Sequence, residues 1–413
     1  MARALAARGH SVAVLVPPYD HPAEAGRRWR AGKAAVHSLP LPLGASADGL
    51  KQAPGLALLS LRLARSALAC RPDIVHLSKP KGVSGTTHLL LRWWRAAMSH
   101  QCMAAHAGER QHPALVVDAD DWEGHGGWNE NEGAYAGWQK EVIDRQEHWG
   151  LQHADAITVA SRALRDRAIA LGQHAESVVY LPNGLSPEDY SEWVSASGQA
   201  VRSRLGLGKQ PTIVLYTRFF EFGPERPARV LAAVRAHIPD AVLFVVGAGK
   251  YGQERRLQME ARSLGLEDSL HVAGWLDRAS LPGALRAADV ALVPADDTLA
   301  NRAKCSMKLA ELLWLGLPVV AERVGEHSSY IDHAITGLLV PPGNDQALAS
   351  ALVTLLRDPD RAARLGAAGH QRIARGFSWE HLALRAEAAY AAALRTDEPS
   401  SRTSPRPVPK SYG

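Results

Sequence analysis

Residues 301–320, NRAKCSMKLAELLWLGLPVV, predict a helix, a tight turn and a buried strand in direct succession. Gly316 can end the helix in the left-handed backbone conformation, and Pro318 prevents the helix from resuming. Val319 and Val320 then form a short apolar run, as expected for a buried strand. A helix that leads straight into a buried strand is typical of an α/β fold with a parallel sheet.

Three charged residues of this segment are spaced to share one face of a single helix. Lys304, Lys308 and Glu311 stand at positions i, i+4 and i+7. A carboxylate can accept hydrogen bonds from ribose hydroxyls, and two lysines can offset phosphate charge. The alternative is an exposed helix with a Lys308–Glu311 pair worth a few tenths of a kcal/mol. Spacing alone leaves both interpretations open.

Composition limits the remaining possibilities. A chain of 413 residues predicts two domains, and 46% apolar residues are ordinary for a globular protein. Three cysteines, at positions 70, 102 and 305, argue against a disulfide framework or a zinc site and favour a reducing, cytoplasmic location. The net charge of +5 fits anionic ligands or lipid headgroups and does not require nucleic acid. No apolar run is long enough to predict a membrane span.

The 301–320 segment resembles the donor-binding element of GT-B glycosyltransferases, in particular the retaining family 4. That element consists of a first glutamate, a helix that bears a second glutamate, and then A-x-G-x-P-V-V. The matching residues are Glu311, at the second glutamate, and Gly316, Pro318, Val319 and Val320. Segments from residues 1–17 to 377–390 resemble the same family in the same order. The resemblance implies an α/β, GT-B fold with two Rossmann-like parallel-sheet domains that face a cleft.

The expected domains follow from this resemblance and from composition. Residues 1–195 would form an acceptor-side domain and residues 205–376 a donor domain, because the intervening stretch is polar and rich in Ser and Gly. Residues 377–395 would form a helix that crosses back to the first domain. Residues 396–413 are rich in Ser, Pro and charge, and we predict that they are disordered.

The N-terminus departs from the family pattern. Residues 2–8 predict a helix before the strand at residues 11–16, whereas the family has a strand and a glycine-rich loop before that helix. We therefore expect the first strand of the N-terminal domain to be missing from the chain as given. Either roughly 20–30 residues precede it in the native protein, or the chain is a genuine short form.

The resemblance also implies a donor site on the second domain. Glu311 would bind the ribose, and Arg218, after the strand at residues 212–216, would bind the diphosphate. In the family, a lysine a few residues after this arginine is the second cation that binds the diphosphate. Gly223 or a neighbour stands at that position here, so Arg226 or Lys304 could supply the second cation. The family's first glutamate is also absent, and the chain resembles a subgroup with N-R-x-K-x-x-x-K-x-x-E instead. The predicted donor residues are Arg218, Gly247, Gly249, Lys304, Lys308, Glu311 and Gly325.

Polar residues after the strands of the first domain would form the opposite wall of the cleft, since ligands of open α/β sheets bind beyond the strand ends. We predict catalytic roles for His76, Asp120, Asp121 and His125 and acceptor contacts for Lys79, Lys81 and Asn183. Solvated loops are the simpler explanation of these clusters. Asp118-x-Asp120 also has the D-x-D form of metal-dependent transferases, but the GT-B resemblance predicts no metal and no cofactor.

These observations predict a hexosyltransferase that moves a sugar, with retention, from a nucleotide diphosphate sugar to a glycan, a lipid-linked glycan or a small molecule. Two alternatives remain, a GT-B scaffold without turnover and a nucleotide-sugar epimerase. The basic, apolar helix expected at residues 54–68 could lie on the inner face of a membrane, or it could be an ordinary packed helix. We expect no nucleic-acid partner.

Overall fold

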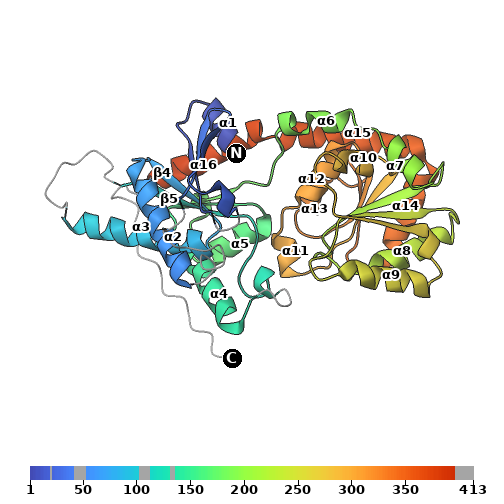
Figure 1. The fold of residues 1–413 in the computed structure, drawn as a ribbon, viewed down its shortest axis with the longest axis horizontal. Helices are drawn as coiled ribbons and strands as arrows, with labels where there is room; N and C mark the ends of the chain where they lie inside the picture. Colours follow the sequence, from blue (N-terminus) through green and yellow to red (C-terminus); the bar gives the residue numbers. More distant parts are fainter. Residues whose placement is uncertain (19–20, 41–52, 102–111, 131–134, 396–413) are drawn as a thin grey trace.

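A computed structural model describes residues 1–18, 21–40, 53–101, 112–130 and 135–395. These residues form two lobes, the N-terminal lobe from α1 to β7 and the C-terminal lobe from β8 to α15 (Figure 1). The segment that was predicted to be a disordered tail, residues 396–413, lies outside the described residues. Among the described helices, none is both long and apolar enough to span a bilayer.

The N-terminal lobe contains two sheets. One has the order β1-β3-β2, with β2 antiparallel to β3, and the other is the fully parallel sheet β4-β5-β6-β7. No ladder joins β1 to β4 in the part of the chain that the structure describes. The helices and strands of this lobe are α1 (Ala2–Ala7), β1 (Ala13–Val16), η1 (Pro22–Glu24), β2 (Arg28–Ala31), β3 (Ala34–Ser38), α2 (Ala53–Ala69), β4 (Ile74–Ser78), α3 (Gly82–Gln101), β5 (Ala114–Ala119), η3 (Trp128–Glu130), α4 (Gly137–Gln152), β6 (Ala156–Val159), α5 (Arg162–Ala170), η4 (Ala175–Ser177) and β7 (Val178–Tyr180).

The C-terminal lobe is built on one parallel sheet with the order β10-β9-β8-β11-β12-β13. A linker of η5 (Pro187–Tyr190), α6 (Ser191–Val194) and α7 (Gln199–Arg204) precedes it. Its helices and strands are β8 (Thr212–Tyr216), α8 (Arg226–Arg235), β9 (Val242–Val246), α9 (Gln253–Ser263), η6 (Glu267–Ser269), β10 (Leu270–Gly274), α10 (Leu281–Leu285), β11 (Val290–Val293), α11 (Leu299–Ala303), α12 (Met307–Trp314), β12 (Val319–Glu322), α13 (His327–Tyr330), β13 (Leu338–Val340), α14 (Asp345–Arg357) and α15 (Pro359–Gly376).

Both faces of this sheet are covered by helices. Val214 and Phe244 point to one face, where they share a core with residues of α10 and α12. Ile213 and Leu243, each one residue earlier on the same strands, point to the other face and pack with α8, α9 and α14. The alternation explains the nearly continuous apolar strands, because neighbouring side chains are buried on opposite faces. Figure 1 shows α10 and α12 above the sheet and α8 and α9 below it.

The last described helix, α16 (Trp379–Arg395), belongs spatially to the N-terminal lobe. Leu382 and Ala386 pack with Leu5 of α1 and Leu181 beyond β7, and Ala393 packs with Val116 of β5. Figure 1 shows α15 and α16 passing from one lobe to the other along the top of the molecule. Small alanine side chains allow this helix to approach the sheet closely.

The 301–320 segment differs from its prediction in one respect. The expected single helix is two helices, α11 and α12, and the prediction that Lys304 shares a helical face with Lys308 and Glu311 is wrong. Thr298 caps α11, and Ser306 caps α12 by accepting the Leu309 N–H at 3.3 Å. Lys304 lies between the two helices in an extended conformation, because two consecutive N-caps divide the segment.

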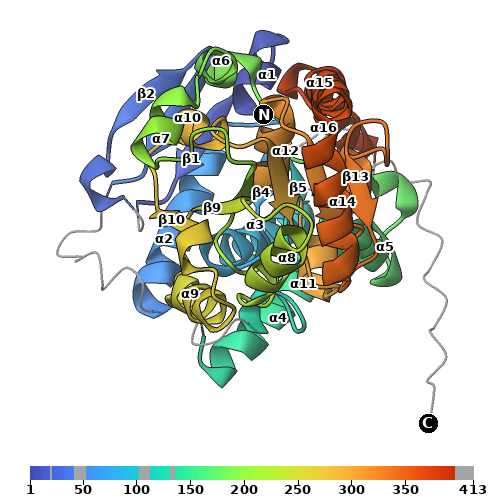
Figure 2. The same ribbon diagram turned by 90° about the vertical axis from the view of Figure 1, so that its right-hand side faces the viewer.

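The lobes touch through α11, which packs against α5. Ala303 is buried in the core of the N-terminal lobe, and the rings of Trp128 and Phe220 meet edge to face across the junction at 5.4 Å. Figure 2 views the molecule along its long axis with the C-terminal lobe in front. These contacts bring the loops that follow β5 and β8 face to face.

Candidate functional site

Two of the predicted donor residues converge on one carboxylate. The Nζ atoms of Lys304 and Lys308 both lie against Oε1 of Glu221, the second at 3.1 Å. Glu221 follows β8, whereas Lys304 precedes α12 and Lys308 lies in its first turn. The segments that follow β8 and β11 therefore meet here. The three side chains are each less than one-fifth exposed. Together with Thr217 and Ser306 they line a hollow of about 30 Å³, roughly the size of one water molecule.

Glu311, the predicted ribose ligand, is largely buried on α12. Its Oε1 accepts a hydrogen bond from the Tyr190 hydroxyl at 2.8 Å, and Tyr216 is a second hydroxyl neighbour. Burial raises the pKa of Glu311, and the tyrosine hydrogen bonds partly counter this effect. Glu311 is therefore already paired with hydroxyl groups, the same kind of donor that a ribose would offer. The simpler Lys308–Glu311 pair does not form, because Lys308 bonds to Glu221 instead.

A larger cavity lies on the other side of Tyr190, between the lobes. It measures about 490 Å³, and its lining includes Arg3, Ser186, Arg278 and Trp379. The Arg278 guanidinium stacks over the Tyr190 ring at 4.8 Å and donates a hydrogen bond to the Asp189 carbonyl. Tyr190 thus separates Glu311 from a hollow that is large enough for a small organic ligand.

The remaining donor-side predictions lie on loops of the C-terminal lobe. Arg218 is exposed, with its guanidinium 5.7 Å from the ring of Trp275. Gly247 has a φ of 118° and leaves no room for a side chain, since a Cβ would lie 1.9 Å from the Thr217 carbonyl oxygen. Gly249 donates its backbone N–H to Glu254 at 3.0 Å. A Cβ on Gly325 would lie 2.7 Å from the backbone of Arg302, so this glycine packs directly on α11.

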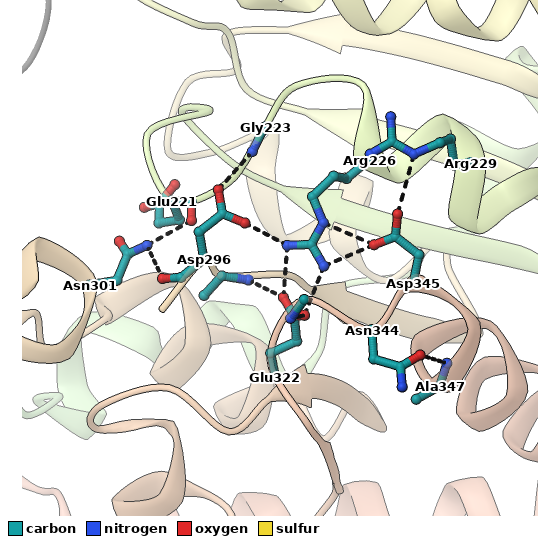
Figure 3. A network of polar contacts seen from close by, with 12 residues as sticks. Glu221, Gly223, Arg226, Arg229, Asp296, Asn301, Glu322, Asn344, Asp345 and Ala347 are labelled. Atoms are coloured by element: carbon teal, nitrogen blue, oxygen red, sulfur yellow. Dashed lines mark hydrogen bonds and ion pairs between the residues drawn. The ribbon is translucent and has the colours of Figure 1, made fainter. Parts of the chain in front are cut away.

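Arg226, one alternative for the second diphosphate cation, is committed elsewhere. Its guanidinium bonds to Asp296 at 2.7 Å, Glu322 at 2.8 Å and Asp345 at 2.9 Å (Figure 3). Glu322 is fully buried, and it also accepts the backbone N–H of Ala295 at 2.7 Å. Arg226 is therefore paired with three carboxylates, whereas Lys304, Lys308 and the exposed Arg218 are further cations at this edge of the sheet.

The N-terminal lobe presents a mixed cluster of charges near the same junction. Lys79 Nζ lies 2.9 Å from Glu123, 3.2 Å from Asp120 and 3.4 Å from Asp121. Lys81 Nζ lies 2.5 Å from Glu123. The structure therefore brings Lys79, Lys81 and the two predicted catalytic aspartates together. Burial raises the pKa of Asp121, with Asp120 adding to this effect and Lys79 opposing it.

His76, a further predicted catalytic residue, lies beneath α16. Its Nδ1 lies 2.9 Å from the Tyr390 hydroxyl and its Nε2 lies 3.2 Å from Thr158 Oγ1. Burial lowers its pKa to about 4, so the ring is neutral near pH 7. Thr158 in turn donates a hydrogen bond to Asp118 at 2.6 Å. This chain of contacts joins His76 to the Asp118 end of β5 and not directly to Asp120 or Asp121.

Two other predicted residues lie apart from the charge cluster. His125 is half exposed, with Nδ1 3.1 Å from Glu130 and Nε2 3.3 Å from Glu141. Asn183 is engaged with the C-terminal lobe, since its side-chain amide donates to the Cys305 carbonyl at 3.2 Å. The roles predicted for these residues stay predictions.

The two aspartates of the D-x-D motif, the alternative metal site, are bound by other side chains of the protein. Asp118 pairs with Thr158, and Asp120 faces the Lys79 ammonium. Within the described ranges no three His, Cys, Asp or Glu side chains are arranged to hold a metal ion.

The sequence did not indicate two residues that the structure places at the site, Glu221 and Tyr190, and it indicated Glu326 only as part of a loop at a strand end. Glu221 stands in the aromatic run FFEF, where charge is unexpected, and that contrast was the available signal. Nothing in the sequence indicates that Tyr190 reaches Glu311. Glu326 is almost fully buried, and its carboxylate accepts the Arg162 N–H at 2.7 Å and the Tyr180 hydroxyl from the other lobe.

Two family comparisons cover most of the chain. Residues 1–184 match the family described as "Glycosyl transferase 4-like domain", and residues 210–358 match "Glycosyl transferases group 1". This chain belongs to the group 1 glycosyltransferases. The family predicted from the sequence is thereby confirmed.

Two named relatives are each less than 30% identical to this chain. A GDP-mannose-dependent α-(1-6)-phosphatidylinositol monomannoside mannosyltransferase of Mycobacterium tuberculosis is 29% identical over 234 residues, 56% of this chain and 60% of the relative. The chain thus spans about 60% of the length of this mannosyltransferase. Glycogen synthase of the same species is 25% identical over 414 residues, 96% of this chain and 90% of the relative.

Solved structures agree on the fold. The sucrose-phosphate synthase of Thermosynechococcus elongatus superposes with a TM-score of 0.65 at 23% identity and covers 94% of this chain and 90% of its own. The predicted GT-B fold is confirmed, and the structure builds its two lobes on parallel sheets of four and six strands.

Proposed function

We propose that this group 1 glycosyltransferase is a hexosyltransferase that moves a sugar, with retention, from a nucleotide diphosphate sugar to an acceptor hydroxyl. The observation that carries the proposal is the convergence of Lys304 and Lys308 at one end of α12, which also bears Glu311. Cations offset the diphosphate charge, and the carboxylate accepts ribose hydroxyls. A ribose entering from the 490 Å³ cavity would take the place of the Tyr190 hydroxyl at Glu311.

The charge cluster of the N-terminal lobe would serve the acceptor. The bond between the anomeric carbon and the diphosphate breaks, the acceptor oxygen bonds to that carbon, and the hydroxyl proton passes to Asp120 or Asp121. The raised pKa of Asp121 supports this role, because such a carboxylate holds a proton more readily. Lys79 and Lys81 are paired with carboxylates, so we propose that they orient those carboxylates beside the acceptor.

We propose a glycan or a lipid-linked glycan as the acceptor, reached at the inner face of a membrane. One relative is named for its action on phosphatidylinositol monomannoside. In this chain, α2 exposes Leu58 and Leu61 on its outer side together with Arg65, a pattern that suits peripheral contact with lipid.

A calorimetric panel tests the donor site. UDP, GDP, ADP and their sugars would be titrated into the wild-type protein and into Glu311→Gln, with and without Mn²⁺. We expect one nucleotide to bind without Mn²⁺ and Glu311→Gln to weaken it about tenfold or more, since charged hydrogen bonds are lost. The exposed Glu192→Gln in the linker is the matched control and should leave affinity unchanged.

The outcomes separate the candidate functions. Unchanged affinity in Glu311→Gln would remove this residue from the donor site. Donor consumption without an acceptor would favour an epimerase. An absence of binding to every nucleotide would overturn the enzyme proposal and favour a scaffold.

A further inference from the structure

One carboxylate oxygen of Glu221 accepts hydrogen bonds from two lysines. Oε1 lies 3.1 Å from Lys308 Nζ and is also hydrogen-bonded to Lys304 Nζ. The carboxylate is 13% exposed and the lysines are 17% and 19% exposed, so water screens the cluster weakly. The Lys304 ammonium also lies 5.0 Å from the Trp128 ring of the other lobe. The pair thus stands at the junction where the lobes meet.

The loop that carries Glu221 is held in place by hydrogen bonds to Asn301 and Asp296. The Glu221 carbonyl accepts the Asn301 side-chain amide at 2.7 Å and the Asp296 N–H at 2.8 Å. The Gly223 N–H donates to Asp296 at 3.1 Å, and Asp296 is held by Arg226 (Figure 3). This network holds the backbone of the loop in place, since the Glu221 carbonyl has two hydrogen-bond donors and Asp296 also binds Gly223 and Arg226.

Without the Glu221 carboxylate, the ammonium groups of Lys304 and Lys308 would repel each other. Burial lowers the pKa of Lys308, and the Lys304 charge adds to this effect, whereas Glu221 opposes it. The same two lysines hold the pKa of Glu221 far below its ordinary value despite burial. Because an ammonium has three donors, each lysine can keep its bond to Glu221 and still donate to a ligand.

We propose that Glu221 is a positioning residue that holds Lys304 and Lys308 side by side as a doubly charged pair for the phosphate groups of the donor. This inference rests on the proposed function. It assigns to a carboxylate an indirect part in binding an anion, which its own charge would oppose. The two ammonium groups and the carboxylate together have a net charge of +1, and both lysines line the hollow.

Other charged groups also face the lysines, and the test has to separate them from Glu221. Arg218 follows β8, Glu311 stands on α12, and both interact electrostatically with Lys308. His327, at the start of α13, and Asp121, from the N-terminal lobe, interact with Lys304. None of these four side chains is replaced in Glu221→Gln, but Glu221 also interacts electrostatically with His327 and raises its pKa, which burial lowers.

The pH dependence of donor binding tests the proposal. Affinity for the nucleotide diphosphate sugar that binds the wild-type protein would be measured between pH 7 and 9.5, a range in which the charge of the diphosphate diester is constant. We expect Glu221→Gln to bind within about threefold of wild type at pH 7 and about tenfold or more weakly at pH 9.5, because one ammonium loses its proton. Glu225→Gln removes the same charge from a partly exposed site at the start of α8, paired with Arg256, and should follow the wild-type curve.

A second measurement does not depend on any ligand. Nuclear magnetic resonance titration of the Lys308 side chain should show a lower midpoint in Glu221→Gln than in the wild-type protein and in Glu225→Gln. Parallel affinity curves for wild type and Glu221→Gln, or equal Lys308 midpoints, would overturn the positioning role. If no donor binds to the wild-type protein but the Lys308 midpoint falls in Glu221→Gln, the proposed function fails and the electrostatic pairing stands.

Discussion

At the scale of single residues, the pKa values of buried acids and bases depend more on the side chains that they contact in the fold than on their neighbours in the sequence. His76 and Asp118 both reach Thr158, one on each side, and Tyr390 closes the chain of contacts at His76. Burial raises the pKa of Asp118 to about 6, although the Thr158 hydrogen bond opposes the shift. Asp118 is therefore protonated in the folded state at pH values where the unfolded chain has already lost the proton.

The replacement Asp118→Asn should change how stability depends on pH. The folded pKa lies above the unfolded value, so wild-type stability falls as pH rises between about 4 and 6. Asparagine has no such step and can still accept the Thr158 hydroxyl. We expect Asp118→Asn to match wild type near pH 4 and to exceed it by on the order of 1–2 kcal/mol above pH 6, since part of Asp118 stays exposed.

Urea unfolding across pH 4 to 8 would measure this difference. Thr158→Val removes the donor that favours the charged carboxylate, and it should move the step to higher pH. A difference between wild type and Asp118→Asn that does not vary with pH would contradict the assignment.

At the scale of elements, α12 and α15 cross with almost no space between their backbones. A Cβ at Gly366 of α15 would lie 2.0 Å from the Gly316 carbonyl oxygen, at the turn that follows α12. Gly316 has a φ of 71°, so its role as the helix stop is borne out by the backbone. The sequence indicated the turn at Gly316, but no local pattern marked Gly366, which is required by a neighbour 50 residues earlier.

Gly366→Ala should destabilise the protein although alanine favours helices. The added methyl group cannot be accommodated without moving α15, and overpacking of this kind costs about 1–3 kcal/mol. Gly376→Ala, at the end of the same helix, meets no atom within 4 Å and should be neutral or stabilising by up to about 1 kcal/mol. Chemical denaturation of both variants would measure the difference, and equal stability would show that α15 shifts freely.

At the scale of the whole molecule, the lobes are joined by buried polar contacts as well as by α11. Glu326 of the C-terminal lobe accepts the first N–H of α5 and the Tyr180 hydroxyl, both from the N-terminal lobe. Tyr330 donates to the Asn183 carbonyl at 2.6 Å beside them. These contacts hold the lobes in one relative arrangement and so determine how closely the two sides of the site approach.

Glu326→Ala should loosen the junction without unfolding either lobe. The Arg162 N–H loses a charged acceptor at a helix N-terminus, so its hydrogen exchange should accelerate about tenfold or more. The radius of gyration from solution X-ray scattering should rise. Tyr180→Phe removes one bond to the same carboxylate, and it should give a smaller effect. Unchanged exchange at Arg162 in Glu326→Ala would show that other contacts alone hold the lobes.

The sequence by itself determined the family, several of the buried strands and the segment that carries the lysines and Glu311. Each of these depends on local patterns, such as apolar runs, a glycine stop and a proline that blocks a helix. It also indicated Asp120, Asp121, Lys79 and Lys81 as neighbours of one sheet edge, because parallel strands end together.

Only the tertiary structure decided which charges meet. Lys304 and Lys308 pair with Glu221, more than 80 residues away, and not with Glu311 on their own segment. His76 lies under α16, and Tyr190 covers Glu311, because loops from distant strands fold together at the junction of the lobes. Such pairings depend on the packing of the whole chain, since side-chain spacing along one helix or strand constrains only near neighbours.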